Sequence, residues 1–108
     1  MRYAVEFALD AEGDLEALAE YIAARDGEAR AEAMLTRIAD AVARRASFPE
    51  RRNVPPELAA SGSREFLEIH ARPYRIVYTI DGARVVVLVV VDSRRDVANA
   101  LAERLARG

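Results

Sequence analysis

An Asp81-Gly82 pair lies between two segments rich in β-branched and aromatic residues, 74–80 and 83–91. Asp-Gly in this setting is typical of a two-residue turn that joins antiparallel strands. A two-residue loop here pairs Ile80 with Ala83, and the alternation of side chains then determines which residues share a face. One face of the predicted hairpin is wholly apolar and should pack against helices: Tyr74, Ile76, Tyr78, Val85, Val87 and Val89.

The opposite face of this hairpin is mixed, and it holds the first candidate site. Arg75 lies on this face, and the second strand leads on to Asp92 and then to Arg94 and Arg95, so we expect these four residues to gather at one end. Two interpretations stay open. Either the cluster binds an anion or a protein partner, or Asp92, Arg94, Arg95 and Asp96 form a structural network of ion pairs at a strand end.

Two stretches near the N-terminus show the spacing of amphipathic helices. The first predicted helix is capped by Asp10 or Asp14 and is broken at Asp26-Gly27. Its apolar stripe consists of Leu15, Leu18, Ala19 and Ile22. The second runs from Glu28 to Ala46 and ends before Pro49, because a proline disfavours a helical residue ahead of it. We expect the two to form an antiparallel helical hairpin.

Three further elements complete the predicted fold. Alternating side chains indicate a strand over residues 2–8, residues 64–70 are rich in β-formers, and a short helix should run from Asp96 to Gly108. Residues 49–63 contain prolines without periodicity and are predicted to be a connecting loop. The order predicts one α+β domain over residues 1–108, with the helical hairpin on a mainly antiparallel four-stranded sheet.

Composition excludes several kinds of site. The chain has no cysteine, and His70 is its one histidine, so thiolate and multi-histidine metal sites are excluded, and we predict neither metal nor cofactor. The longest apolar run, Val85 to Val91, is far shorter than the roughly 20 residues that cross a bilayer. The first residues lack a signal-peptide pattern. We therefore expect a cytoplasmic protein with no membrane partner.

Charge is nearly balanced in total but unevenly distributed. The formal net charge of −2 argues against direct DNA binding by this chain alone. Residues 10–32 are rich in carboxylates, whereas the stretch from Arg37 to Arg52 holds five arginines against Asp40 and Glu50. A local basic surface is therefore compatible with the sequence.

His70 is the candidate for proton transfer. Glu68 lies two residues away on the same face of the predicted strand. A histidine held by a carboxylate can act as a general acid or base. A lone histidine at a strand end is more often a surface or packing residue, and this simpler interpretation stays open as well.

Several segments together resemble a known family. They are Arg64 to Ile69, the stretch Pro73-Tyr74-Arg75-Ile76-Val77-Tyr78, Val85 to Val91, and Asp92-Ser93-Arg94-Arg95-Asp96-Val97. With the opening strand and helical hairpin, they resemble the RelE/ParE superfamily, the toxins of bacterial type II toxin-antitoxin systems. The resemblance implies a cognate antitoxin, ParD-like or related, that wraps a helix or tail over the toxin in a hetero-oligomer.

Two activities divide that superfamily. RelE-like members cut messenger RNA on the ribosome, and here Arg75 and Arg94 match two of their basic positions. Other positions depart from that pattern: Phe66, Glu68, Asp92 and Ala100. ParE-like members poison DNA gyrase by protein-protein contact and resemble this chain better, which makes gyrase inhibition the main hypothesis.

Two alternatives remain beside gyrase inhibition. One is a ribosome-dependent ribonuclease with an atypical site built on Arg75, His70 and Arg94, and the other is a non-toxic module that only binds antitoxin. For gyrase contact, the resemblance implies the C-terminal segment, roughly Asp96 to Arg107. Candidate partner-binding residues are Arg75, Asp92, Arg94 and Arg95, together with apolar positions on two helices, namely Leu15, Leu18, Ile22, Leu101 and Leu105.

Overall fold

The structure is a computed structural model that describes residues 3–48, 53–59, 62 and 65–106. Its elements are β1 (Ala4–Phe7), α1 (Leu9–Asp26), α2 (Glu28–Ser47), α3 (Pro56–Ala59), β2 (Leu67–Ala71), β3 (Tyr74–Asp81), β4 (Arg84–Asp92) and α4 (Val97–Ala106). The predicted α+β order is confirmed, with one addition. The segment expected to be a loop contains the short helix α3, which begins with Pro56 because proline suits the first helical position.

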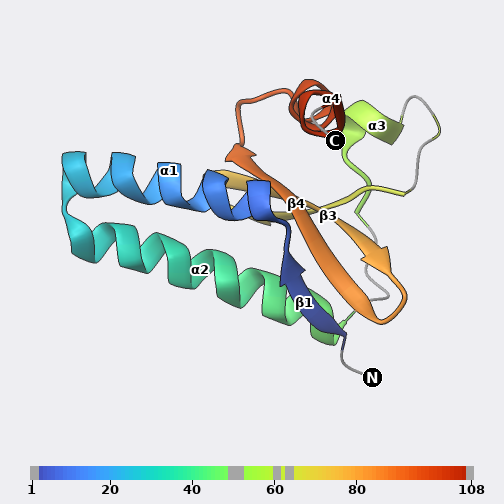
Figure 1. Cartoon of the computed structure of the whole chain (residues 1–108), viewed down its shortest axis with the longest axis horizontal. Helices are drawn as coiled ribbons and strands as arrows, with labels where there is room; N and C mark the ends of the chain where they lie inside the picture. Colours follow the sequence, from blue (N-terminus) through green and yellow to red (C-terminus); the bar gives the residue numbers. More distant parts are fainter. Residues whose placement is uncertain (1–2, 49–52, 60–61, 63–64, 107–108) are drawn as a thin grey trace.

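The sheet has four strands in the order β1-β4-β3-β2 (Figure 1). β3 pairs antiparallel with both β2 and β4, whereas β1 runs parallel to β4. The sheet is therefore mixed. The helical hairpin separates β1 from the other strands along the chain, so β1 can lie parallel to β4. β1 and β2 form its two edges.

The turn between β3 and β4 differs from the predicted one. Asp81 pairs with Arg84, so the two loop residues are Gly82 and Ala83, and the predicted pairing of Ile80 with Ala83 is wrong. Gly82 has φ +60°, whereas no described residue other than glycine has a positive φ. This matches the hairpin turn that needs glycine at its first central position only. The turn therefore forms one residue later than the Asp-Gly pattern indicated.

An irregularity in β4 changes the predicted faces further along the strands. Tyr78 pairs with Val87 but Val77 pairs with Val89, so Leu88 is an extra residue, a β-bulge. Beyond it the alternation is inverted, and Val90 rather than Val89 joins the core beneath the helical hairpin. The other five residues of the predicted apolar face do lie in that core: Tyr74, Ile76, Tyr78, Val85 and Val87.

The helical hairpin covers one face of the sheet, as predicted (Figure 1). Gly27, with φ +97°, ends α1 by donating its N–H to the carbonyl of Ala23 and starts α2 by accepting from Ala31. The predicted caps of α1 are wrong, because the N-cap is Ala8 and the helix begins at Leu9. Asp10 lies in the first turn, and Asp14 makes tertiary contacts instead.

The second face of the sheet is covered by α3 and α4 (Figure 1). Val77, Val89 and Val91 are buried beneath α4 with Val97 and Leu101. Sequence reasoning expected this face to be mixed, but the bulge adds Val89 and Val91 to it. The molecule therefore has a core on each side of the sheet.

Candidate functional site

Arg75 lies at the centre of a buried charge network on the α4 side of the sheet. Its two terminal nitrogens donate to both carboxylate oxygens of Glu57, at 2.7 and 2.8 Å, and one of them also donates to Glu68 at 2.6 Å. Arg75 is 8% exposed and Glu68 only 2%. Glu57 also accepts the backbone N–H of Val97 at 3.1 Å. The guanidinium thus joins α3, β2 and β3 at the point where α4 begins.

The electrostatics of this network favour the charged forms. The hydrogen bonds from Arg75 lower the pKa of Glu57 to about 2, despite partial burial that opposes the shift. Hydrogen bonding to Glu57 raises the pKa of Arg75, again against burial. A cation held by two carboxylates at these distances has little remaining charge to offer a third anion.

His70 joins the network through Glu68, as its position in the strand indicated. A ring nitrogen of His70 contacts a carboxylate oxygen of Glu68, while about half of the histidine side chain is exposed. Because Glu68 also accepts from Arg75, its carboxylate is shared between the two residues. The predicted proximity of Glu68 and His70 is confirmed, and Arg75 lies within the same network.

Asp92, Arg94 and Arg95 do not gather with Arg75, so that prediction is wrong. Arg75 pairs with Val91 while Tyr74 pairs with Asp92, which places Arg75 and Asp92 on opposite faces. The cause is the bulge in β4, which inverts the alternation assumed from sequence. Asp92 instead accepts from the backbone and side chain of Arg94 at 2.9 and 3.1 Å, and these bonds lower its pKa.

Asp14 and Arg104 form a second ion pair that sequence reasoning missed. β1 pairs with β4 only as far as Val87, which leaves part of that edge of β4 without a strand partner. Asp14 accepts the N–H of Val90 at 2.9 Å, and Arg104 donates to the carbonyl of Leu88. The two side chains also pair with each other at 2.7 Å. They close the strand edge and connect α4 to α1.

The apolar residues predicted to bind a partner differ in exposure. Leu101 is 3% exposed and belongs to the core beneath α4, whereas Leu105 is 53% exposed. The α1 residues Leu15, Leu18 and Ile22 are half-buried against the main core. Leu18 and Arg95 line one hollow of about 290 Å³ between α1 and α4. The structure thus brings these two candidates together and leaves Leu105 on the surface.

No helix among the described residues is long and apolar enough to span a membrane. Over the same residues, histidines and acidic side chains form no group of three or more that could hold a metal ion.

This architecture, with a helical hairpin and a C-terminal helix on opposite faces of a small mixed sheet, is the α+β fold that the resemblance implied. A family model described as the ParE toxin of the type II toxin-antitoxin system, parDE, matches residues 5–97, and the chain belongs to that family.

A solved structure has the same fold. A chain of the chromosomal ParDE toxin-antitoxin system from P. aeruginosa matches with a TM-score of 0.69 at 14% sequence identity, covering 84% of this chain and 96% of that one. The comparison with curated proteins found no match. The chain is therefore a ParE-type toxin, a component of a toxin-antitoxin system.

Proposed function

We propose that this toxin inhibits DNA gyrase by protein-protein contact and that a cognate antitoxin neutralises it. The observation that carries this proposal is the engagement of Arg75 by Glu57 and Glu68. Arg75 is the cation on which a ribonuclease site would have to be built. Its charge is already balanced within the fold, and this favours a toxin that acts through its surface.

The chemistry of RNA cleavage sharpens the contrast. Cleavage without a metal needs a base and preorganised positive groups that stabilise the charge developing on the phosphate. Here two carboxylates stand beside Arg75, and Arg94 lies on the other side of the sheet. A phosphate placed against this network would lie close to the carboxylates of Glu57 and Glu68, which oppose its charge.

The C-terminal helix is the proposed surface for gyrase. Asp96 caps it by accepting the N–H groups of Ala98 and Asn99, and Leu101 anchors it in the second core. With α4 fixed by these contacts and by the bond from Arg104 to Asp14, the side chain of Leu105 lies on the solvent side of the helix. A fixed amphipathic helix with an exposed leucine is a suitable docking element.

The remaining parts of the proposal follow from the family. We infer that antitoxin and toxin form a hetero-oligomer in the bacterial cytoplasm, and that the toxin alone does not bind DNA. The formal net charge of −2 supports the last point, because non-specific DNA binding depends on positive charge.

Expression in bacteria tests the proposal. The chain should arrest growth, induce a DNA-damage response and leave ribosome-bound messages uncut, and co-expression of the adjacent gene product should restore growth. Leu105→Arg should relieve the arrest without unfolding the protein, because this side chain contributes little to the core. Message cuts at defined codons, with no DNA-damage response, would instead support the ribonuclease.

A further inference from the structure

Three exposed arginines follow one side of α2. Arg30, Arg37 and Arg44 are spaced seven residues apart, so they share a helix face with roughly 10 Å between neighbours. None of them makes a hydrogen bond or an ion pair with another described residue. Arg75 and Arg104, in contrast, are each paired with carboxylates. The three residues therefore carry positive charge that the described part of the chain leaves unpaired.

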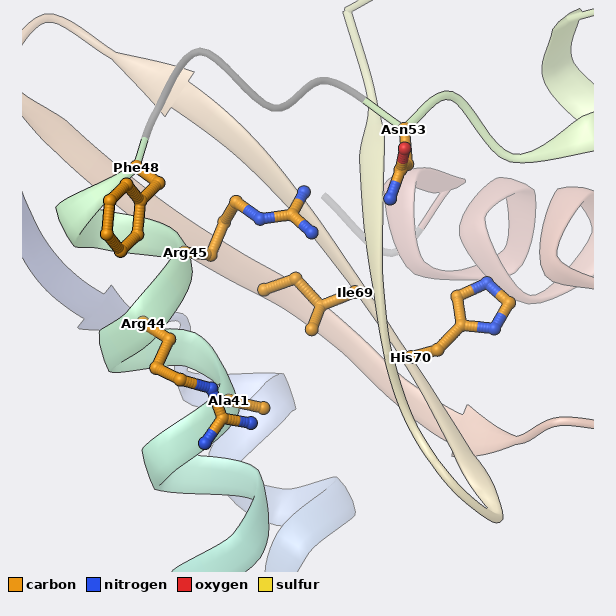
Figure 2. Close-up of a pocket in the computed structure, with 7 residues that line it drawn as sticks. All are labelled: Ala41, Arg44, Arg45, Phe48, Asn53, Ile69 and His70. Carbon is orange, nitrogen blue, oxygen red and sulfur yellow. The ribbon is translucent and has the colours of Figure 1, made fainter.

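Hollows lie at both ends of this row of arginines, on the side of α2 that faces the sheet edge. Figure 2 shows the first, of about 380 Å³, with Arg44 and Phe48 projecting from α2 while Ile69 and His70 lie on β2. Phe48 is 63% exposed, which is unusual for so large an apolar side chain.

The second hollow, of about 550 Å³, has Arg30 and Arg37 on one wall and Pro73 and Tyr74 on the other. We call the surface along α2 from Arg30 to Phe48, together with the facing β2 and the turn that follows it, the α2–β2 groove.

The far wall of the groove is a sheet edge. β2 ends the strand order, and the backbone groups of Glu68 and His70 point away from β3 because pairing alternates along an antiparallel strand. The N–H of Glu68 donates to the carbonyl of Asn53 at 2.7 Å. The amide of His70 has no backbone partner among the described residues. An edge of this kind can accept a further strand.

We propose that the α2–β2 groove binds an extended acidic segment of the antitoxin. The segment pairs with the backbone of β2 at His70, its carboxylates face Arg30, Arg37 and Arg44, and an apolar side chain covers Phe48. The proposal rests on the proposed function for the existence of this partner. It adds where the partner lies and which chemistry recognises it.

Other features of the groove favour a polypeptide over a nucleic acid. Asp26 and Asp92 line the same hollow as Arg30 and Arg37, so the positive charge along it is interrupted. Separate carboxylates on a peptide can be placed opposite single arginines, whereas a continuous row of phosphates cannot avoid the two aspartates. A strand edge offers hydrogen bonds that match a peptide backbone, and Phe48 offers an apolar contact. An acidic peptide uses all three features, whereas a phosphate backbone uses only the arginines.

The test measures the Kd between the full-length toxin and the full-length protein encoded by the adjacent gene, at low and high salt. Arg37→Ala removes one positive charge from the groove. Ala39→Glu is the matched control, since it changes the net charge by the same amount at an exposed position on the opposite side of α2. We expect Arg37→Ala to raise the Kd at least fivefold, more at low salt, and Ala39→Glu to change it less than twofold.

Hydrogen exchange gives an independent measurement. Binding should slow exchange of the His70 amide, and equal melting temperatures of the variants confirm that both fold. Equal Kd values for the two variants, or unchanged exchange at His70, would overturn the groove assignment while leaving the antitoxin itself in place.

Failure of the wild-type toxin to bind the adjacent gene product would remove the antitoxin from the proposed function, and the groove assignment with it. If the adjacent protein binds Arg37→Ala normally while a short RNA or DNA oligonucleotide loses binding, the groove belongs to a nucleic acid and the proposal is overturned.

Discussion

Arg75 illustrates how one side chain can appear functional in sequence and prove structural in three dimensions. Alternation along β3 placed it correctly on the face away from the helical hairpin. Its partners could not be predicted, since Glu57 comes from a segment without periodicity and reaches Arg75 only because α3 forms there. Glu68 was identified from sequence as a departure from the ribonuclease pattern, and its carboxylate does lie against Arg75.

The pH dependence of stability tests this network. Glu57 has a folded-state pKa of about 2, below its ordinary value of 4.5, so its contribution to stability is present above pH 4.5 and is lost as the pH falls toward 2. We expect this loss to be about 2 kcal/mol after allowance for partial exposure. Urea unfolding of the wild type and of Glu57→Gln should show it, with the variant less dependent on pH.

An exposed carboxylate provides the control for that experiment. Glu20 is exposed on α1, so the Glu20→Gln variant should show the same pH dependence of unfolding free energy as the wild type. If Glu57→Gln and Glu20→Gln gave the same profiles, the ion pair with Arg75 would not stabilise the fold in the way described.

The tie between Asp14 and Arg104 gives a second prediction for a single residue. Asp14→Ala removes the acceptor for Val90 and leaves Arg104 without its closest carboxylate, so we expect a loss of about 2 kcal/mol in unfolding free energy. Hydrogen exchange at Val90 should also accelerate. Asp40→Ala, at an exposed position on α2, should change neither quantity appreciably; similar effects of both substitutions would contradict the role of Asp14.

Among the elements, the periodic segments could be predicted and the irregular ones could not. The second long helix and the strands over 74–80 and 83–91 follow the expected ranges within about one residue. α1 begins before both of its predicted caps, β1 begins two residues after the predicted start, and the strand over 64–70 begins later, at Leu67. The turn moved because Gly82 fits either loop position. The bulge escaped detection because β4 is almost entirely valine and leucine, so Val89 and Val90 carry no signal of which one faces the helices.

In the C-terminal helix, we expect one substitution to lower the unfolding free energy and another to weaken gyrase inhibition with little effect on stability. Leu101→Ala removes a buried side chain and should cost about 2–4 kcal/mol of unfolding free energy. Leu105→Ala should cost less than about 0.5 kcal/mol, since the residue is exposed, yet weaken gyrase inhibition at least fivefold. Denaturant unfolding and a supercoiling assay on both variants would reveal a failure of this separation.

At the scale of the molecule, the two faces of the sheet carry different elements and different proposed surfaces. The helical hairpin provides the main core and, along α2, the arginines Arg30, Arg37 and Arg44, which pair with no described residue. The other face carries α4 over a second core, joined to the body through Arg75, Glu57 and Asp14. A proposed antitoxin surface and a proposed gyrase surface therefore lie on different elements, so antitoxin on α2 would have to act on α4 by steric coverage or through the sheet.

Purified DNA gyrase provides the most direct test of the central claim. The toxin should inhibit supercoiling of relaxed plasmid in a concentration-dependent manner, and the same preparation should leave messenger RNA on programmed ribosomes intact. Supercoiling that proceeds normally at a large excess of folded toxin, together with ribosome-dependent cleavage of the message, would contradict the account.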